Sequence, residues 1–205
     1  MTEGFLFIRH GSLAFPKGVF LGSQDVPLSP LGRKQISQQA LKLRGEYLDS
    51  LTALVSSDLK RCRESAAILV ETWAKELPLE FDPNLREISL GAFEGLSKEE
   101  VKKKWPLAYE RRGLHLETFV PLGGESFEML KRRVFFSLDY WSKVKRKGLL
   151  GIVTHAGVLR VILAHYLALP LKDIWRLPLP YGCYFRLPTW PLDGNNDEEL
   201  KFESF

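Results

Sequence analysis

Two histidines follow short apolar runs in this chain. Residues 5–8 lead into Arg9 and His10, residues 149–153 lead into His155, and a glycine closely follows each histidine. If both runs are parallel strands, both histidines lie at the carboxyl edge of one sheet, where open α/β sheets bind ligands. A neutral imidazole at that edge can act as a nucleophile or a base. A single histidine after a strand is usually structural. It is therefore the occurrence of two histidines in the same position that indicates a functional site.

Three further segments place polar groups where they could reach the same edge. Arg61 falls in the first turn of an expected helix, and its planar guanidinium can bind two phosphate oxygens at once. Glu87 follows another apolar run and is a candidate acid. Residues 123–126 place two glycines before a helix start, so they could form an anion site or only a helix cap.

Four apolar runs predict the strands that position these groups, at residues 5–8, 51–55, 79–81 and 149–153. All four are expected to be buried. Helical patterns lie between them, and this alternation is typical of an α/β domain with a largely parallel sheet. The turn-forming residues 193–196, Asp-Gly-Asn-Asn, further predict an antiparallel C-terminal hairpin at the sheet edge. Its two strands are expected within residues 181–187 and 200–205.

Helix starts can be read from capping residues. Ser29 precedes Pro30, which is typical of an N-cap followed by proline at the first helical position. Asp58 is expected to cap the next helix, and a third helix is expected to begin near Ser126. Residues 158–169 are apolar nearly all round, which predicts a helix packed on both sides.

Residues 96–124 do not fit the strand-helix alternation and are interpreted as a lid-like insertion. Ser97 and Glu100 have the spacing of a capping box, and Pro106 interrupts the helical pattern that follows. Aromatic residues in and near this segment could line a pocket for a planar leaving group, although such residues are more often part of the core. They are Trp105, Tyr109, Phe119 and Phe127.

The 205 residues, 45% hydrophobic and 26% charged, suit one soluble globular domain, because a domain usually takes roughly 100–200 residues. No apolar run approaches the roughly 20 residues of a membrane span, and a cytoplasmic protein is expected. Cys62 and Cys183 are expected to be buried thiols.

Residues 98–147 carry a local charge of +6, above the +4 of the whole chain, and this excess favours anionic ligands. The runs of lysine and arginine there are nevertheless more typical of solvated helix faces.

Five short motifs together resemble the histidine phosphatase superfamily, in its phosphoglycerate-mutase-like branch. In chain order they are residues 9–11, 56–66, 85–95, 123–126 and 154–158. The resemblance spans residues 5–160 and implies one histidine-phosphatase domain over residues 1–205. It also implies a three-layer α/β/α fold with a largely parallel central sheet and an antiparallel C-terminal edge.

The resemblance implies a role for each candidate residue. His10 would attack phosphorus and form a phosphohistidine. Arg9, Arg61 and His155 would surround the phosphoryl oxygens, so neither a metal nor a cofactor is expected. Glu87 would protonate the leaving oxygen and then activate the water that cleaves the phosphohistidine. That role requires its carboxyl to be protonated when substrate arrives.

Within this superfamily, residues 20–32 and 85–95 resemble the alpha-ribazole phosphatases of cobalamin assembly. Mutases of this branch place an asparagine in the loop after the nucleophile, and none occurs here before Leu28. Ser23 and Gln24 are candidate substrate contacts in that loop. Residues 111–112 lie about where mutases carry two arginines for the substrate carboxylate. The remaining alternatives among enzymes are a phosphoglycerate mutase and a broad-specificity phosphatase of small molecules.

A protein of another class, binding a phosphorylated ligand or nucleic acid without catalysis through residues 98–147, is the further alternative. It is disfavoured because binding needs no nucleophile, acid and three oxygen-binding groups together. The expected partner is therefore a small-molecule phosphomonoester, with neither nucleic acid nor membrane. A homodimer is left open.

Overall fold

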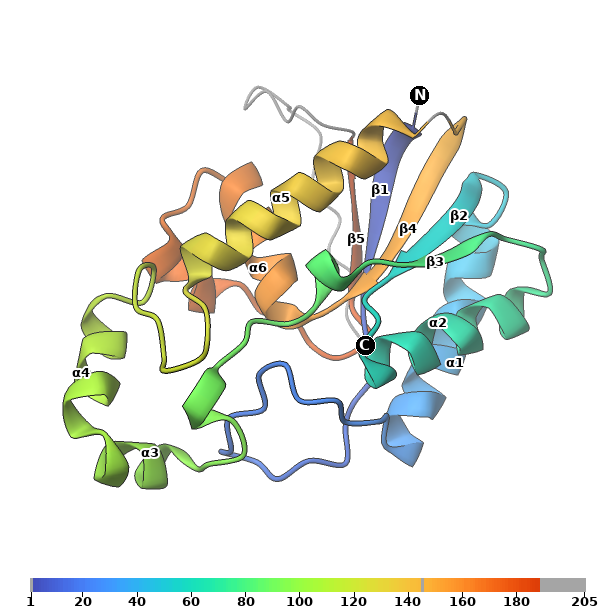
Figure 1. Cartoon of the computed structure of the whole chain (residues 1–205). Helices are drawn as coiled ribbons and strands as arrows, with labels where there is room; N and C mark the ends of the chain where they lie inside the picture. The colour runs from blue at the N-terminus through green and yellow to red at the C-terminus, as the bar shows by residue number, and fades with distance from the viewer. Residues whose placement is uncertain (1, 145, 189–205) are drawn as a thin grey trace.

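The computed structural model describes residues 2–144 and 146–188, and Figure 1 shows their arrangement. The strands are β1 (Thr2–Arg9), β2 (Leu51–Ser56), β3 (Leu79–Phe81), β4 (Gly148–Thr154) and β5 (Tyr184–Pro188). The α-helices are α1 (Pro30–Tyr47), α2 (Lys60–Trp73), α3 (Lys98–Lys104), α4 (Pro106–Leu114), α5 (Phe127–Lys143) and α6 (Ala156–Tyr166). Three short 3-10 helices are η1 (Pro83–Leu85), η2 (Gly91–Phe93) and η3 (Leu171–Arg176).

The five strands form one sheet in the order β3-β2-β4-β1-β5. Strands β1 to β4 run parallel to one another, and β5 runs antiparallel to β1 at the edge. The predicted parallel sheet with an antiparallel C-terminal edge is therefore confirmed. The other half of the predicted hairpin, residues 200–205, lies outside the described residues.

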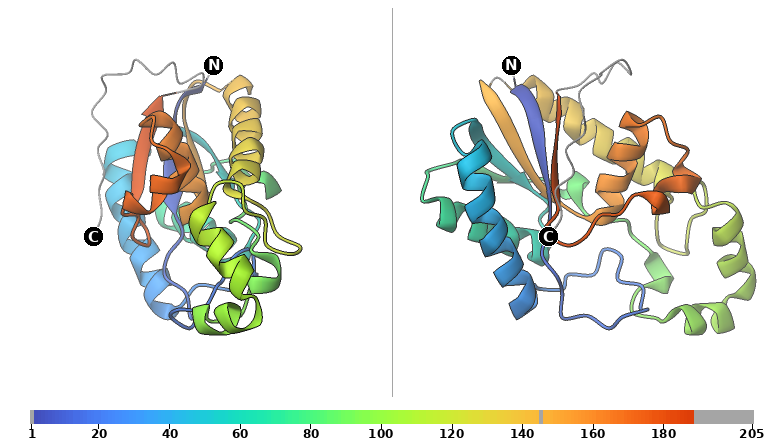
Figure 2. Two further views of the ribbon diagram at one scale, coloured as in Figure 1. Left: turned by 90° about the vertical axis from the view of Figure 1, so that its left-hand side faces the viewer. Right: turned by 180° about the vertical axis from the view of Figure 1, so that it is seen from behind.

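Helices cover both faces of this sheet, with α1 and α2 on one side and α5 on the other (Figure 2). The alternation along β1 explains the two layers, because successive side chains of a strand point to opposite faces. Phe5 and Phe7 pack into the core beneath α5 and α6, whereas Leu6 and Ile8 pack against α1 and α2. Each such fully buried side chain contributes about 1.5–3 kcal/mol.

Side-chain caps fix where several helices begin, as the sequence predicts. The Ser29 hydroxyl accepts a hydrogen bond from Gly32 N at 3.0 Å, and Pro30 opens α1. Ser126 caps α5 through Met129 N at 3.1 Å. Residues 123–126 thus include a helix cap, at Ser126.

The expectation that Asp58 caps α2 is wrong. The N-cap of α2 is Leu59, which has no capping side-chain hydrogen bond. The Asp58 carboxylate instead binds the guanidinium of Arg86 through two contacts, at 2.6 and 2.5 Å. A bidentate pair between two charged groups is stronger than a single carboxylate bond to a backbone N–H, and Arg86 comes from a segment distant in sequence.

Two further predictions need correction. β3 is at the sheet edge and is not buried, since Phe81 keeps 45% of its surface exposed. The last helix begins two residues earlier and ends three residues earlier than the apolar pattern suggests. It ends because Ala168 takes a left-handed conformation, with φ of 50°, which a continuing helix cannot contain. Among the described residues, no helix is long and apolar enough to cross a membrane.

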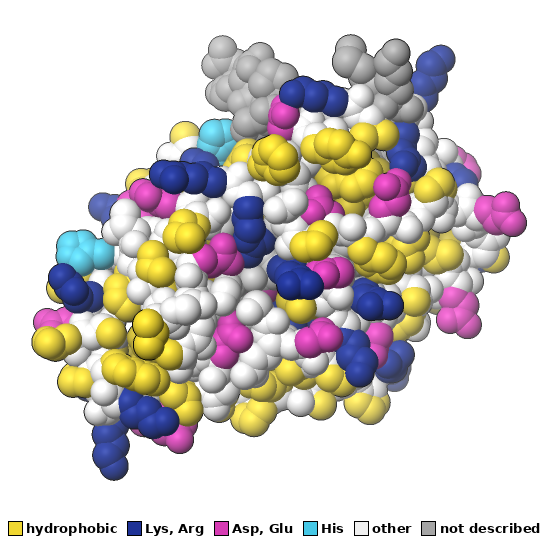
Figure 3. All heavy atoms as spheres, in the orientation of Figure 1, with side chains coloured by type: hydrophobic (Ala, Val, Ile, Leu, Met, Phe, Trp, Pro, Cys, Tyr) yellow, Lys and Arg dark blue, Asp and Glu magenta, His cyan; other side chains and the backbone are white. Residues whose placement is uncertain are grey.

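The segment at residues 96–124 forms α3 and α4. The capping box of Ser97 and Glu100 is present, and Pro106 separates the two helices. No residue of α4 is buried, and hydrophobic side chains lie beside lysines and arginines over this part of the surface (Figure 3). Of the aromatic residues named above, Phe127 is buried in the main core, and the other three are partly buried against it. Trp105 and Phe119 also line a groove beside α4.

Candidate active site

The pairing of the central strands brings the two histidines together. Arg9 at the end of β1 pairs with Thr154 at the end of β4, so His10 and His155 leave adjacent strands at the same edge. Their ring centroids are 5.1 Å apart. His10 is 3% exposed and His155 is completely buried.

His10 has the tautomer that a nucleophile needs. Its Nδ1 lies 2.8 Å from the carbonyl oxygen of Gly11, and a carbonyl can only accept, so Nδ1 carries the proton. Nε2 therefore keeps a free electron pair. Burial, followed by the charges of Arg9 and Arg61, holds the pKa of His10 well below its ordinary value, so the ring is neutral at pH 7.

Gly11 allows this loop to pack directly on α1. A Cβ at position 11 would lie 2.3 Å from the carbonyl oxygen of Gly32, and a Cβ at position 32 would lie 2.0 Å from that of Ser12. Both positions therefore exclude any side chain. This backbone contact fixes the direction in which the chain carries His10 away from β1.

Arg61 lies in the first turn of α2 and is fully buried. Its Nη1 donates to the Gln24 carbonyl at 2.5 Å and its Nη2 donates to the Gly22 carbonyl at 3.1 Å. A guanidinium has five N–H donors, and the third donor in use is Nε, which binds His155. The loop at residues 22–24 thus holds Arg61 beside the two histidines.

The bond from Arg61 Nε to His155 Nδ1 measures 3.1 Å and sets the second tautomer. Because a guanidinium can only donate, Nδ1 accepts and Nε2 carries the proton. Nε2 lies 2.8 Å from the Ser57 hydroxyl. The pKa of His155 lies well below its ordinary value, mainly because the ring is buried and secondly because of the positive charge of Arg61. Cys62 lies 3.3 Å from Nε2, and burial raises the pKa of its thiol.

Arg9 points back beneath the loop that precedes β5. Its Nη1 donates to the Leu179 carbonyl, and its guanidinium carbon lies 4.0 Å from the ring centroid of Tyr181. The Tyr181 ring is also 5.6 Å from the His10 ring. Sequence reasoning missed Tyr181, because a tyrosine in a loop between elements carries no distinguishing local signal.

Glu87 reaches the site from the segment between η1 and η2. Its Oε2 accepts a hydrogen bond from Gly157 N at 3.1 Å, in the first turn of α6. A Cβ at position 157 would lie 2.2 Å from Glu87 Oε1, so a side chain there would displace the Glu87 carboxylate.

Comparison with known proteins identifies the family of this chain. A family model for the histidine phosphatase superfamily (branch 1) matches residues 5–193. The chain belongs to the histidine phosphatase superfamily. The adenosylcobalamin/alpha-ribazole phosphatase of Salmonella typhimurium is 29% identical over 181 residues, 86% of each chain. The 2,3-bisphosphoglycerate-dependent phosphoglycerate mutase of Cytophaga hutchinsonii is 27% identical over 207 residues, 92% of this chain and 96% of the mutase.

A solved structure from Escherichia coli shares the fold of this histidine phosphatase. It aligns over 99% of this chain and 95% of its own, with a TM-score of 0.83 and 21% identity. The five-stranded sheet with helices on both faces is thus the phosphoglycerate-mutase-like α/β fold that the motifs predicted.

The loop that holds Arg61 is itself held by Glu94. Glu94 Oε1 accepts from Ser23 N at 2.8 Å, from the Ser23 hydroxyl at 3.0 Å and from Leu90 N at 2.9 Å. Gln24 contributes its carbonyl to Arg61. Ser23 and Gln24, the two predicted substrate contacts, therefore take part in hydrogen bonds that shape the loop: Ser23 through its N–H and hydroxyl, Gln24 through its carbonyl. Glu94 was visible in the sequence only as part of a family motif.

The two arginines of the lid-like segment point to different places. Arg112 is half-buried, and its guanidinium carbon lies 5.4 Å from the ring centroid of Phe20, in the loop after His10. Burial lowers the pKa of Arg112. Arg111 is exposed and lines a groove with Leu107 and Leu122.

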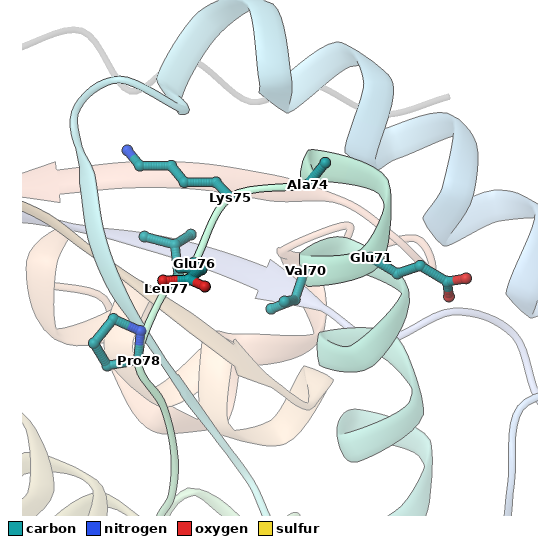
Figure 4. Close-up of a pocket in the computed structure, with 7 residues that line it drawn as sticks. All are labelled: Val70, Glu71, Ala74, Lys75, Glu76, Leu77 and Pro78. Atoms are coloured by element: carbon teal, nitrogen blue, oxygen red, sulfur yellow. The ribbon is translucent and has the colours of Figure 1, made fainter.

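A separate pocket lies at the opposite end of α2 (Figure 4). Its lining comes from the last turn of this helix and the chain leading to β3: Val70, Glu71, Ala74, Lys75, Glu76, Leu77 and Pro78. The Lys75 ammonium donates to the carbonyls of Leu48 and Leu51, at 2.7 and 3.1 Å. This pocket shares no residue with the site. Among the described residues, no group of three or more His, Cys, Asp or Glu side chains could hold a metal ion.

Proposed function

We propose that this chain hydrolyses small-molecule phosphomonoesters without a metal, through a phosphohistidine at His10. The observation that carries the proposal is the neutral His10 ring with a free electron pair on Nε2, placed beside His155, Arg61 and Arg9. An in-line attack by this nitrogen needs no prior deprotonation at pH 7.

The cationic groups have donors left for the phosphoryl oxygens. Three of the five N–H groups of Arg61 bind atoms of the described residues, and the other two have no partner there and could bind substrate. Arg9 Nε is buried without a hydrogen-bond partner among the described residues. A dianionic phosphoryl group would satisfy these donors and stabilise the charge that develops during transfer. His155 would complete the cradle by turning its Nε2 proton, which faces the Ser57 hydroxyl at 2.8 Å, toward a phosphoryl oxygen.

The reaction divides into two balanced steps. In the first, His10 Nε2 bonds to phosphorus while the bond from phosphorus to the leaving oxygen breaks, and Glu87 gives that oxygen its proton. In the second, the Glu87 carboxylate takes a proton from water as the water oxygen bonds to phosphorus. The bond from phosphorus to nitrogen then breaks, inorganic phosphate leaves, and His10 regains its electron pair.

For the substrate, we propose an ester resembling alpha-ribazole phosphate. The Salmonella relative is named for that substrate, and it matches over 86% of both chains. The mutase of Cytophaga hutchinsonii has nearly the same identity over a larger share of its length, so mutase activity is the second candidate. The absence of an asparagine between His10 and Leu28 favours the phosphatase.

A phosphate-release screen in the presence of chelator tests this function. The panel contains alpha-ribazole phosphate, phosphoserine, sugar phosphates, nucleotides and 3-phosphoglycerate, with His10→Ala as the control. We expect hydrolysis of one or a few esters by the wild type only. Isomerisation of 3-phosphoglycerate without release would support the mutase, and strict dependence on a divalent metal would contradict the proposal.

A further inference from the structure

Arg133 of α5 holds the segment that carries Glu87. Its Nη1 donates to the carbonyl oxygens of Asn84 and Arg86, at 2.7 and 2.8 Å, and its Nη2 donates to the carbonyl of Glu87 itself, at 3.1 Å. One planar guanidinium therefore binds three carbonyls within four consecutive residues. No other side chain among the described residues makes hydrogen bonds to this set of carbonyls.

Glu125 occupies the rest of the guanidinium. Arg133 Nε donates to Glu125 Oε2 at 3.0 Å, and Nη2 donates to Glu125 Oε1 at 2.6 Å. Glu125 also exchanges hydrogen bonds with Ser89, accepting from its N–H and donating to its carbonyl, both at 2.9 Å. Residues 84–89 are thus fastened on both sides of Glu87.

All five N–H donors of Arg133 are used within the protein. None is left for a phosphoryl oxygen, which separates Arg133 from Arg9 and Arg61. Its side chain is 22% exposed, and that of Glu125 is 14% exposed, so water competes little for these bonds. The hydrogen bonds of Arg133 can therefore act on the reaction only through the backbone they hold.

We infer that Arg133 is a positioning residue that aligns Glu87 for proton transfer to the leaving oxygen, with Glu125 as its support. This inference rests on the proposed function, because it assigns a purpose to the proton donor named there. Proton donation by a positioned acid is typically worth about 10²–10⁴-fold in rate, and a misplacement of about 1 Å can remove much of that gain. The carboxyl of Glu87 is held at one end by Gly157 N, and Arg133 holds its backbone at the other.

Leaving-group dependence separates positioning from general damage to the fold. Proton donation matters for an alkyl phosphate, whose leaving alkoxide is strongly basic, and matters little for 4-nitrophenyl phosphate. We expect Arg133→Gln and Glu125→Gln to lower kcat/KM, which excludes the later hydrolysis of the phosphohistidine, about 10- to 100-fold for an alkyl phosphate and less than about 3-fold for the aryl ester. Arg133→Lys, which keeps the charge and loses the fork, should fall between.

Ser137→Ala is the matched control. Ser137 lies one turn along α5 from Arg133 and donates a 2.6 Å hydrogen bond to Asp82, just before residues 84–89. This variant removes a buried hydrogen bond from the same helix and should lower stability without selective loss on alkyl esters. If it shows the same selectivity as Arg133→Gln, the effect belongs to the whole segment and the inference is overturned.

A double-mutant cycle keeps the inference distinct from the proposed function. In a Glu87→Gln background, Arg133→Gln should cause no further selective loss on the alkyl ester. Equal loss on both esters in the single Arg133 variant, while Glu87→Gln remains selective, would overturn the inference alone. Absence of selectivity in Glu87→Gln itself would instead count against Glu87 as the acid and so against the proposed function.

Discussion

The Nε of Arg61 donates to Nδ1 of His155 across 3.1 Å, and both side chains are completely buried. This bond links α2, the helix after β2, to the residue that directly follows β4. It fixes the His155 tautomer and the direction of the Arg61 guanidinium at the same time. The geometry of the proposed phosphoryl site therefore depends on this pair as a unit.

Arg61→Lys should damage both activity and stability. A lysine carries its donors on one nitrogen and cannot serve His155, Gly22 and Gln24 while also binding a phosphoryl group. We expect kcat/KM to fall about 10²–10³-fold and the free energy of unfolding to fall by about 2 kcal/mol or more. Steady-state kinetics and urea titration measure these effects. The matched control is Arg63→Lys, an exposed arginine in the same helical turn, and a similar loss there would contradict the account.

Stability should fall as the pH drops below about 6.5. The folded-state pKa values of His10 and His155 both lie well below the ordinary value of 6.5, so between the two values the unfolded chain binds protons that the folded chain does not. The free energy of unfolding should then decrease by up to about 1.4 kcal/mol per pH unit for each histidine.

Urea titrations at pH 7.5 and pH 5.5 in buffers without phosphate test this slope, because bound phosphate would oppose it by binding the folded state. The variants His10→Asn and His155→Asn should each flatten the dependence. A wild type equally stable at both pH values would show that these rings do not resist protonation in the folded protein.

Gly157→Ala should misplace Glu87 while leaving the fold intact. The added Cβ would meet the Glu87 carboxylate at 2.2 Å, so this side chain must move away from the start of α6. We expect kcat/KM for an alkyl phosphate to fall about 10- to 100-fold, with a smaller effect on kcat/KM for an aryl phosphate. At Gly113 in α4 a Cβ meets no atom within 4 Å, so Gly113→Ala should keep wild-type rates. Wild-type alkyl turnover in Gly157→Ala would argue against the proton-donor role of Glu87.

Much of the fold follows from local sequence patterns. The apolar runs place β1, β2 and β4, and the shared direction of parallel strands is enough to bring His10 and His155 to one edge. Ser29 and Ser126 mark helix starts because their hydroxyls bond to backbone only three residues away. Such short-range interactions can be read from spacing alone.

What the sequence could not show depends on partners distant along the chain. Asp58 has the type and place of an N-cap, but Arg86, 28 residues away, captures its carboxylate. Tyr181 contacts Arg9 and His10 only because β5 pairs beside β1. Arg133 looked like part of a solvated basic run, whereas packing of α5 turns it onto the Glu87 segment.

Trapping the covalent intermediate tests the central claim most directly. The wild type is mixed with 4-nitrophenyl phosphate in chelator, quenched in alkali, which preserves phosphohistidine, and analysed by peptide mass spectrometry. The account predicts a phosphoryl group on His10, formed fast enough to account for turnover and absent from His10→Ala. Turnover by the wild type with no phosphorylated His10, or hydrolysis by His10→Ala at the wild-type rate, would contradict it.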